Sequence, residues 1–256
     1  QVAEALGYQW YFVEYTKEKW YDCAHTDGMK AYYSFAGNLV SLPHIQDFLA
    51  VKELKEEGKI PNNAVFVPGH TGDMISGGHI PLDYDHLQAY TFGKFLEDNL
   101  KKHYNLWSWD EAELGHLFKD KMQKSVGDVS VHDNESCANA IELFDFNERQ
   151  AKFIVNSVRA YEFFGYQWRI PLWDVELMDF FLKIGLEQRI QQRIYICYVR
   201  NRLFIDTLNP LFTIDCTTDL TTDLNVKKSQ NRPSILRPLS NALLSYLVLD
   251  LGWASV

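Results

Sequence analysis

The run Ala64-Val65-Phe66-Val67 constrains the fold more than any other feature of the chain. Turn residues Pro61-Asn62-Asn63 precede it, and Pro68-Gly69 follows it. A short, continuous apolar run between turns is typical of a strand buried on both faces, as in a parallel sheet. Apolar residues at helical spacing come just before the run, from Ile45 to Leu54. The order of helix and strand therefore predicts an α/β fold with a parallel sheet and flanking helices.

Elements of both kinds are expected in the first third of the chain. Residues 2–6 resemble the end of a helix that Gly7 stops, and the aromatic run Tyr8–Tyr15 predicts a strand. A helix is expected over Met29–Phe35, and another from a capping Ser41 to Glu57.

Strand patterns disappear after residue 85, and helical patterns replace them. Helices are expected over 87–101, 110–124, 147–164, 176–183 and 187–203. The segment 217–224 is expected to be a loop, and 231–238 to be irregular. We therefore predict an α/β nucleotide- or pyrophosphate-binding part at 1–90, and a mainly helical part at 91–256 that packs on it.

Composition excludes several classes of protein. The 256 residues carry 34 acidic and 25 basic side chains, which disfavours general binding of nucleic acid or anionic membranes. Hydrophobic residues make up 46%, so the chain is not mostly disordered. The longest apolar stretch, Ala242–Trp253, is too short to span a bilayer. Four scattered cysteines predict free thiols in a reducing compartment, and so a cytoplasmic protein: Cys23, Cys137, Cys197 and Cys216.

The segment Val67–Pro81, with sequence VPGHTGDMISGGHIP, is the candidate site. It directly follows the predicted strand, and ligands of parallel sheets bind beyond the carboxyl ends of strands. Gly69 and Gly72 allow close approach of an anion or a positive φ, and the Asp73 carboxylate could hold Mg²⁺. These features predict a pocket for pyrophosphate and magnesium. The alternative is an ordinary glycine-rich turn in which Asp73 caps a helix.

Two blocks in this sequence resemble asparagine synthase-like enzymes of the adenine nucleotide α-hydrolase-like (PP-loop) superfamily. Gly69, Asp73, Gly77 and Gly78 match the family's pyrophosphate motif G-x-G-x-D-E-x-x-G-G. The variant PGHTGDMISGGHIP is similar to the branch found in bacterial surface-polysaccharide gene clusters. The second block is GYQWRIPLWD, residues 165–174, which resembles G-L-E-x-R-x-P-F-L-D.

The resemblance implies ATP-dependent activation of a carboxylate, such as a sugar acid, as an acyl-adenylate, followed by amide formation. ATP and Mg²⁺ are the implied cofactors, and a separate glutaminase is a possible source of ammonia. Asp73 would bind Mg²⁺ and His70 would face the reacting centre. The residues implied for the pyrophosphate cradle are Gly69, Thr71, Gly72, Gly77 and Gly78, and Arg193 or Arg200 would touch phosphate.

The chain also departs from the family. The ATP loop S-G-G-x-D-S and the catalytic lysine are absent, His70 stands where the family carries Glu, and Met74 replaces the second acidic residue. The expectation is a chain truncated at its N-terminus. The alternative is a non-catalytic relative or fragment that acts as a scaffold or binds a phosphorylated metabolite.

Other residues were weighed as candidates. His70 could act as an acid or base, or be a polar loop histidine. His79, Asp83, Asp85 and His86 could form a metal cluster, or a polar linker. His44 and Asp47 could contact substrate, or start a helix. Arg169 and Asp174 of the second block are interpreted mainly as architectural, and Arg169 could instead contact a ligand. Trp168 and Trp173 are interpreted as core or interface residues rather than a stacking platform.

Overall fold

The computed structural model describes residues 2–85 and 91–199. Val13–Gln192 form one compact unit. The first helix, α1 (Val2–Ala5), and the last described helix, α12 (Arg193–Tyr198), belong to a separate unit and are described only by their bounds.

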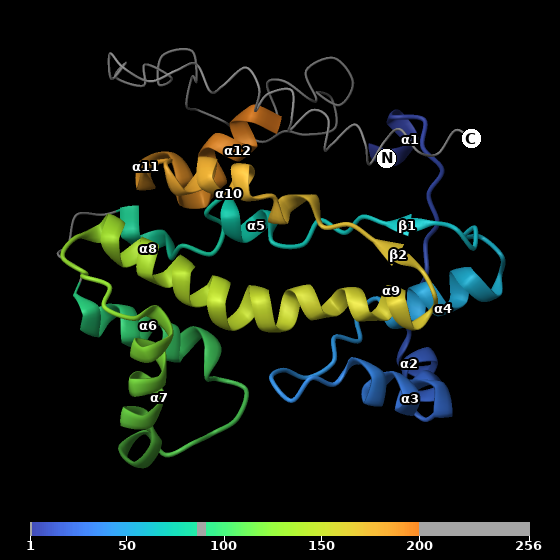
Figure 1. Ribbon diagram of the computed structural model, residues 1–256, viewed down its shortest axis with the longest axis horizontal. Coiled ribbons are helices and arrows are strands. Elements are labelled where there is room, and N and C mark those ends of the chain that lie inside the picture. The colour runs from blue at the N-terminus through green and yellow to red at the C-terminus, as the bar shows by residue number, and fades with distance from the viewer. Residues whose placement is uncertain (1, 86–90, 200–256) are drawn as a thin grey trace. The chain divides into compact units, whose positions relative to one another are not determined.

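A long helical rod forms the centre of the compact unit (Figure 1). It consists of α8 (Asn134–Phe144), a π-helix (Asp145–Ile154), a 3₁₀ turn (Val155–Val158) and α9 (Arg159–Phe163). The residues at each joint keep right-handed helical dihedrals, so the rod is continuous. The rod begins at Asp133, which forms a capping box with Ser136. It ends before Gly165, whose φ is +86°.

Two helical groups pack at the two ends of the rod (Figure 1). Helices α6 (Phe92–His103) and α7 (Glu111–Val126) pack on α8, around buried Phe95, Met122 and Phe144. Helices α3 (Asp27–Ala36) and α4 (Phe48–Glu56) pack on α9, and α2 (Lys17–Ala24) lies against α3. Tyr32, Phe48 and Ala160 lie in that second core.

The described strands are β1 (Val65–Phe66) and β2 (Gln167–Trp168), which pair in parallel. Val65 pairs with Gln167 and Phe66 with Trp168. The short helix α5 (Gly72–Ile75) follows β1, and a 3₁₀ turn (Pro171–Trp173) and α10 (Val175–Leu182) follow β2. The remaining elements of this unit are a 3₁₀ turn (Leu82–Asp85), α11 (Leu186–Arg189) and a 3₁₀ turn (Ile190–Gln192).

The mainly helical character after the first third is confirmed, and the described strands pair in parallel as predicted, although β2 was not expected. Helices were predicted correctly in place at α1, α3, α6, α7 and α10. β1 precedes residue 90 and β2 follows it, so the sheet joins the two parts that the sequence separated. The unit Val13–Gln192 also extends across that boundary.

Several local predictions were wrong. Tyr8–Tyr15 forms no strand. The side chains of Trp10 and Phe12 are exposed to solvent. α4 starts at Phe48, because the Ser41 hydroxyl donates to the Lys152 carbonyl instead of capping a helix.

Three further predictions need correction. Strand β1 is not buried on both faces, since Val65 is 46% exposed. The helix expected over 187–203 breaks at Gln191 and Gln192, both of which have positive φ. The helix expected from residue 147 already begins at Asn134.

Some expectations lie outside the described residues: Arg200, Cys216, and the segments 217–224 and 231–238. Cys23, Cys137 and Cys197 are buried free thiols, as predicted. Among the described helices, none has the length and apolar character needed to cross a bilayer.

Candidate functional site

The fold brings the two sequence blocks together. Parallel strands end at the same edge of a sheet, so the segments that follow β1 and β2 emerge side by side. The Trp173 indole N–H donates to the Thr71 hydroxyl at 2.9 Å. A Cβ added to Gly72 would lie 2.7 Å from Leu172 Cδ1, so this glycine allows close packing of the two blocks.

The loop's conformation differs from the expected one. Thr71, not Gly69 or Gly72, takes the left-handed conformation, with φ +75°. Gly77 has φ +94°, and a Cβ there would overlap the Arg189 carbonyl. A Cβ on Gly78 would lie 2.8 Å from the Asp73 carbonyl oxygen. Gly77 and Gly78 are therefore required by backbone packing inside this unit, whatever the loop binds.

A continuous polar network connects the glycine loop to the π-helix. The Thr71 hydroxyl donates to Gln150 Oε1 at 2.8 Å, and Gln150 Nε2 donates to Asp145 Oδ2 at 3.0 Å. The same Asp145 oxygen lies 2.6 Å from His79 Nδ1, and His79 Nε2 lies 2.9 Å from Asp73 Oδ2. We call Asp73, His79 and Asp145 the acid–imidazole–acid relay.

The relay runs from the surface to the interior. The Asp73 side chain is 60% exposed, His79 is 14% exposed and Asp145 is fully buried. Burial opposes the charge on His79, but hydrogen bonds to Asp145 and Asp73 raise its pKa to about 9. The hydrogen bond from His79 lowers the pKa of Asp73 to about 2. At neutral pH the relay is therefore an imidazolium between two carboxylates.

The π-helix explains why Asp145 and Gln150 face the loop together. In a π-helix the hydrogen bonds run from i to i+5, so residues four or five apart lie over one another. Asp145 and Gln150, which are five residues apart, therefore lie over one another and are hydrogen-bonded. π-Helical turns are rare and often occur at functional sites.

Two further cations lie near the relay. Lys102 Nζ donates to the His79 carbonyl at 3.0 Å. Burial lowers the Lys102 pKa, and the charge of Arg149 adds to that lowering. Within the described residues, the Arg149 guanidinium has no hydrogen-bond or ion-pair partner. It is thus available to an anion beside Asp73.

His70 lies on the other side of the loop, against the rod. Ser157 donates its hydroxyl hydrogen to the Ile154 carbonyl at 2.6 Å, so His70 Nε2 donates to Ser157 Oγ at 2.5 Å. This assigns the Nε2–H tautomer and leaves Nδ1 as the accepting nitrogen. Burial lowers the pKa of His70, so the ring is neutral at physiological pH.

The metal cluster considered as one alternative for His79 is not seen among the described residues. His79 pairs with Asp73 and Asp145, and Asp83 lies 3.6 Å from Lys94. His86 lies outside the described residues. No group of three or more metal-binding side chains occurs in the described ranges 2–85 and 91–199.

A single carboxylate with phosphate oxygens still suits Mg²⁺, which keeps several waters and uses one or two protein carboxylates. Asp73 fits this role by its exposure. However, its Oδ1 accepts from the Met74 N–H and its Oδ2 from His79. Magnesium would have to share these oxygens with the imidazolium.

The remaining candidates have structural partners. Asp174 caps α10, accepting from the N–H groups of Glu176 and Leu177, which confirms its architectural role. Asp47 accepts from the Tyr161 hydroxyl at 2.8 Å. Arg169 is exposed, and its guanidinium donates to the Trp168 carbonyl. Arg193 belongs to the other unit, so its predicted contact with phosphate stays a prediction.

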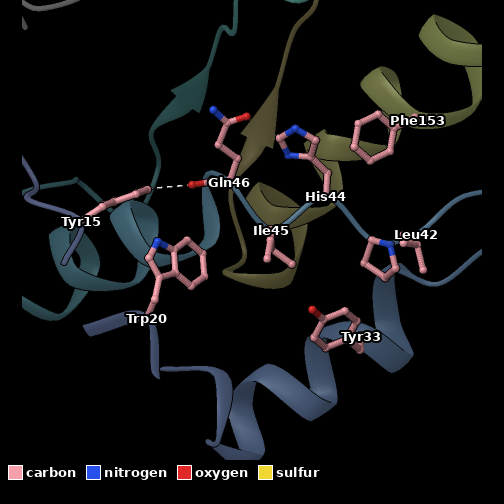
Figure 2. Close-up of a pocket in the computed structure, with 9 residues that line it drawn as sticks. Tyr15, Trp20, Tyr33, Leu42, His44, Ile45, Gln46 and Phe153 are labelled. Atoms are coloured by element: carbon pink, nitrogen blue, oxygen red, sulfur yellow. Dashed lines mark hydrogen bonds between the residues drawn. The ribbon is translucent and has the colours of Figure 1, made fainter. Parts of the chain in front are cut away.

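An apolar groove of about 570 Å³ opens where α2, α3 and the segment before α4 meet the π-helix (Figure 2). We call it the aromatic groove. Its lining residues are Tyr15, Trp20, Tyr33, Leu42, Pro43, His44, Ile45, Gln46 and Phe153. The Tyr15 hydroxyl closes one end by donating to the Gln46 carbonyl at 2.8 Å. His44 lies beside Phe153, with ring centroids 5.1 Å apart.

Sequence reasoning missed Asp145, Arg149 and Gln150. They occupy the polar stretch DFNERQ, which looks like the solvated face of a helix. No motif marks them, and only the fold places them against the glycine loop.

Comparison with known proteins adds no relative. No protein-family model, curated protein or solved structure matches the chain. The resemblance to asparagine synthase-like enzymes therefore stays a prediction.

Proposed function

We propose that this chain contributes the pyrophosphate-binding part of an ATP-dependent ligase that forms an amide on a carboxylate through an acyl-adenylate. The observation that carries this proposal is the pairing of β1 with β2. It sets the two blocks that resemble the asparagine synthase family side by side, and Thr71 and Trp173 link them. The cytoplasmic location and the separate glutaminase that would supply ammonia stay predictions.

In this proposal the exposed Asp73 carboxylate and the backbone of the Gly69–Gly72 turn face the pyrophosphate. Arg149 and Lys102 would offset part of the anion's charge. His79 Nε2 would hold the Asp73 carboxylate in one orientation, because His79 Nδ1 is itself hydrogen-bonded to fully buried Asp145. Magnesium, when bound, would offset charge on the leaving pyrophosphate. His70, neutral and with Nδ1 accepting, suits a base toward the attacking amine.

A second candidate is a non-catalytic protein that binds a phosphorylated metabolite or scaffolds a partner. The contacts of Asp73 favour it. Both carboxylate oxygens already have donors, and the His79 imidazolium neutralises the charge that would attract a magnesium ion. In this case the cations near the relay would bind phosphate without metal.

Calorimetric titration separates the two. Pyrophosphate and ATP are titrated into the full chain with Mg²⁺ and then with EDTA. The ligase proposal expects magnesium-dependent binding that Asp73→Asn weakens about tenfold or more. The matched control is Asp120→Asn, which removes an exposed carboxylate on α7 and leaves binding unchanged.

The outcomes are distinct. Binding that persists in EDTA and in Asp73→Asn supports the phosphometabolite candidate. Absence of binding to either ligand by folded protein contradicts the ligase proposal and the phosphometabolite candidate for this chain alone, and favours the scaffold.

A further inference from the structure

The aromatic groove is a feature of the described residues that the proposed pyrophosphate site leaves unused. Small-molecule sites are typically concave, mostly apolar and about 300–1,000 Å³ in volume, with a few placed polar groups. The groove meets these criteria at about 570 Å³. Its walls include Trp20 and two tyrosines, Tyr15 and Tyr33, that are 40% and 44% exposed.

Five of the nine residues that line the groove carry rigid, flat rings. Figure 2 shows Ile45 between Trp20 and Tyr33 in this view, and His44 next to Phe153. Trp20 is held edge-on by Tyr15, with ring centroids 5.6 Å apart. Such side chains offer large contact areas and lose little conformational entropy when a ring packs on them.

The groove also has unused polar capacity at its His44 end. His44 Nδ1 is buried and has no hydrogen-bond partner within the described residues. Burial lowers the pKa of His44, so the imidazole is neutral and can exchange one hydrogen bond with a hydroxyl group.

Arg149 connects this end of the groove to the pyrophosphate side. It precedes the groove residue Phe153 by four positions, which places both on one side of the π-helix. Burial is the main cause that lowers the pKa of His44, and the hydrogen bond from His79 is the main cause that lowers the pKa of Asp73. The positive charge of Arg149 contributes to the lowering of both pKa values. A guanidinium without a partner suits a carboxylate, which it can bind through two parallel hydrogen bonds.

We propose that the aromatic groove holds the ring of a cyclic carboxylic acid, whose carboxylate pairs with Arg149. This inference rests on the proposed function, because it identifies the class of acid that the ligase would activate. The ring packs between Trp20 and Tyr33, and a ring hydroxyl pairs with His44. The carboxylate then points along the π-helix toward Asp73, where the pyrophosphate would leave.

Equilibrium binding to the full chain tests the proposal. Galacturonate represents a hydroxylated ring, benzoate an aromatic ring and acetate the carboxylate alone. Each is titrated with and without magnesium pyrophosphate, by calorimetry and by tryptophan fluorescence. We expect at least one ring acid to bind tenfold or more tightly than acetate. A preference for galacturonate over benzoate supports the hydroxyl contact with His44, and the opposite preference contradicts that contact.

Four variants locate the ligand. Arg149→Gln weakens ring-acid binding about tenfold, and Tyr33→Ala about fivefold. Their matched controls leave binding within about twofold. These are Lys124→Gln, which removes an exposed cation on α7, and Tyr21→Ala, which removes a tyrosine that is 67% exposed and outside the groove. Circular dichroism and melting temperature establish that each variant is folded.

Three results overturn the proposal. One is that no ring acid binds saturably, with or without magnesium pyrophosphate, and another is that ring acids bind no more tightly than acetate. The third is that the control variants Lys124→Gln and Tyr21→Ala lose as much ring-acid affinity as Arg149→Gln and Tyr33→Ala. Failure of the proposed function is measured separately. If ring acids bind as expected while pyrophosphate shows no Asp73-dependent binding, the ligase proposal fails and the groove assignment stands.

Discussion

Raising the pH removes a stabilising charge from the centre of the polar network. The pKa of His79 is 6.5 in an unfolded chain and about 9 in the folded protein. The folded state therefore holds this proton more tightly than the unfolded state does. The stabilisation is complete below pH 6.5 and is lost as the pH rises through about 9.

The magnitude follows from the size of the pKa change. One pKa unit corresponds to about 1.4 kcal/mol, so the relay stabilises the protonated protein by about 3 kcal/mol. The conversion is appropriate for His79, because its side chain is only 14% exposed. Asp73 gains from the same hydrogen bond, so its lowered pKa is not added to this free energy.

Urea unfolding, followed by circular dichroism at pH 6 and pH 9.5, measures the effect. We expect the free energy of unfolding to fall by about 3 kcal/mol more in the wild type than in His79→Gln. The variant is the necessary control because other groups also titrate. The pKa of Glu142, for example, is raised by burial to about 7, and the charge of His79 lowers it, so Glu142 titrates in both proteins but at a higher pH in His79→Gln.

Two results would refute the reasoning. One is an equal pH dependence in wild type and His79→Gln. The other is an NMR titration of the His79 ring with a midpoint near 6.5. Either result would mean that Asp73 and Asp145 do not hold an imidazolium between them.

Three stability measurements test other features by urea unfolding. Gly77→Ala is expected to lower the free energy of unfolding by about 3 kcal/mol, because Gly77 has a positive φ and an added Cβ would overlap the Arg189 carbonyl. The control Gly58→Ala also has a positive φ, but its Cβ would meet open space, so we expect a loss of about 1 kcal/mol. Thr71→Val removes the hydrogen-bond partner of buried Gln150 and of partly buried Trp173 and costs about 2 kcal/mol. Glu142→Leu removes the buried partner of Arg189 and costs about 3 kcal/mol at pH 8.

Local patterns predicted the helices well, because the capping residues, the apolar spacing and the terminating residue of a helix all lie within or next to the helix itself. α7 has a capping Asp110, apolar residues at helical spacing and a terminating Gly127. α10 begins at Asp174, whose carboxylate accepts from two backbone N–H groups. Predictions that depend on such neighbours do not require knowledge of the tertiary structure.

Strands and the site depend on partners far along the chain. β2 has two residues, and its partner β1 lies about a hundred positions earlier, so periodicity cannot reveal it. The glycine spacing did identify Thr71 and Asp73 as part of a site. It could not identify Gln150 or Asp145, because a π-helical register differs from an α-helical register only in the folded rod.

His79 shows why proximity in sequence was misleading. Asp83 is four residues away and Asp145 is sixty-six residues away, yet the imidazole binds Asp145. Charges that share solvent attract by only about 1 kcal/mol at 4 Å, because water screens them. A fully buried carboxylate has lost its water and must be compensated by a nearby donor or cation. Asp145 is such a carboxylate, so its burial accounts for its pairing with one nitrogen of His79, while the exposed Asp73 pairs with the other nitrogen.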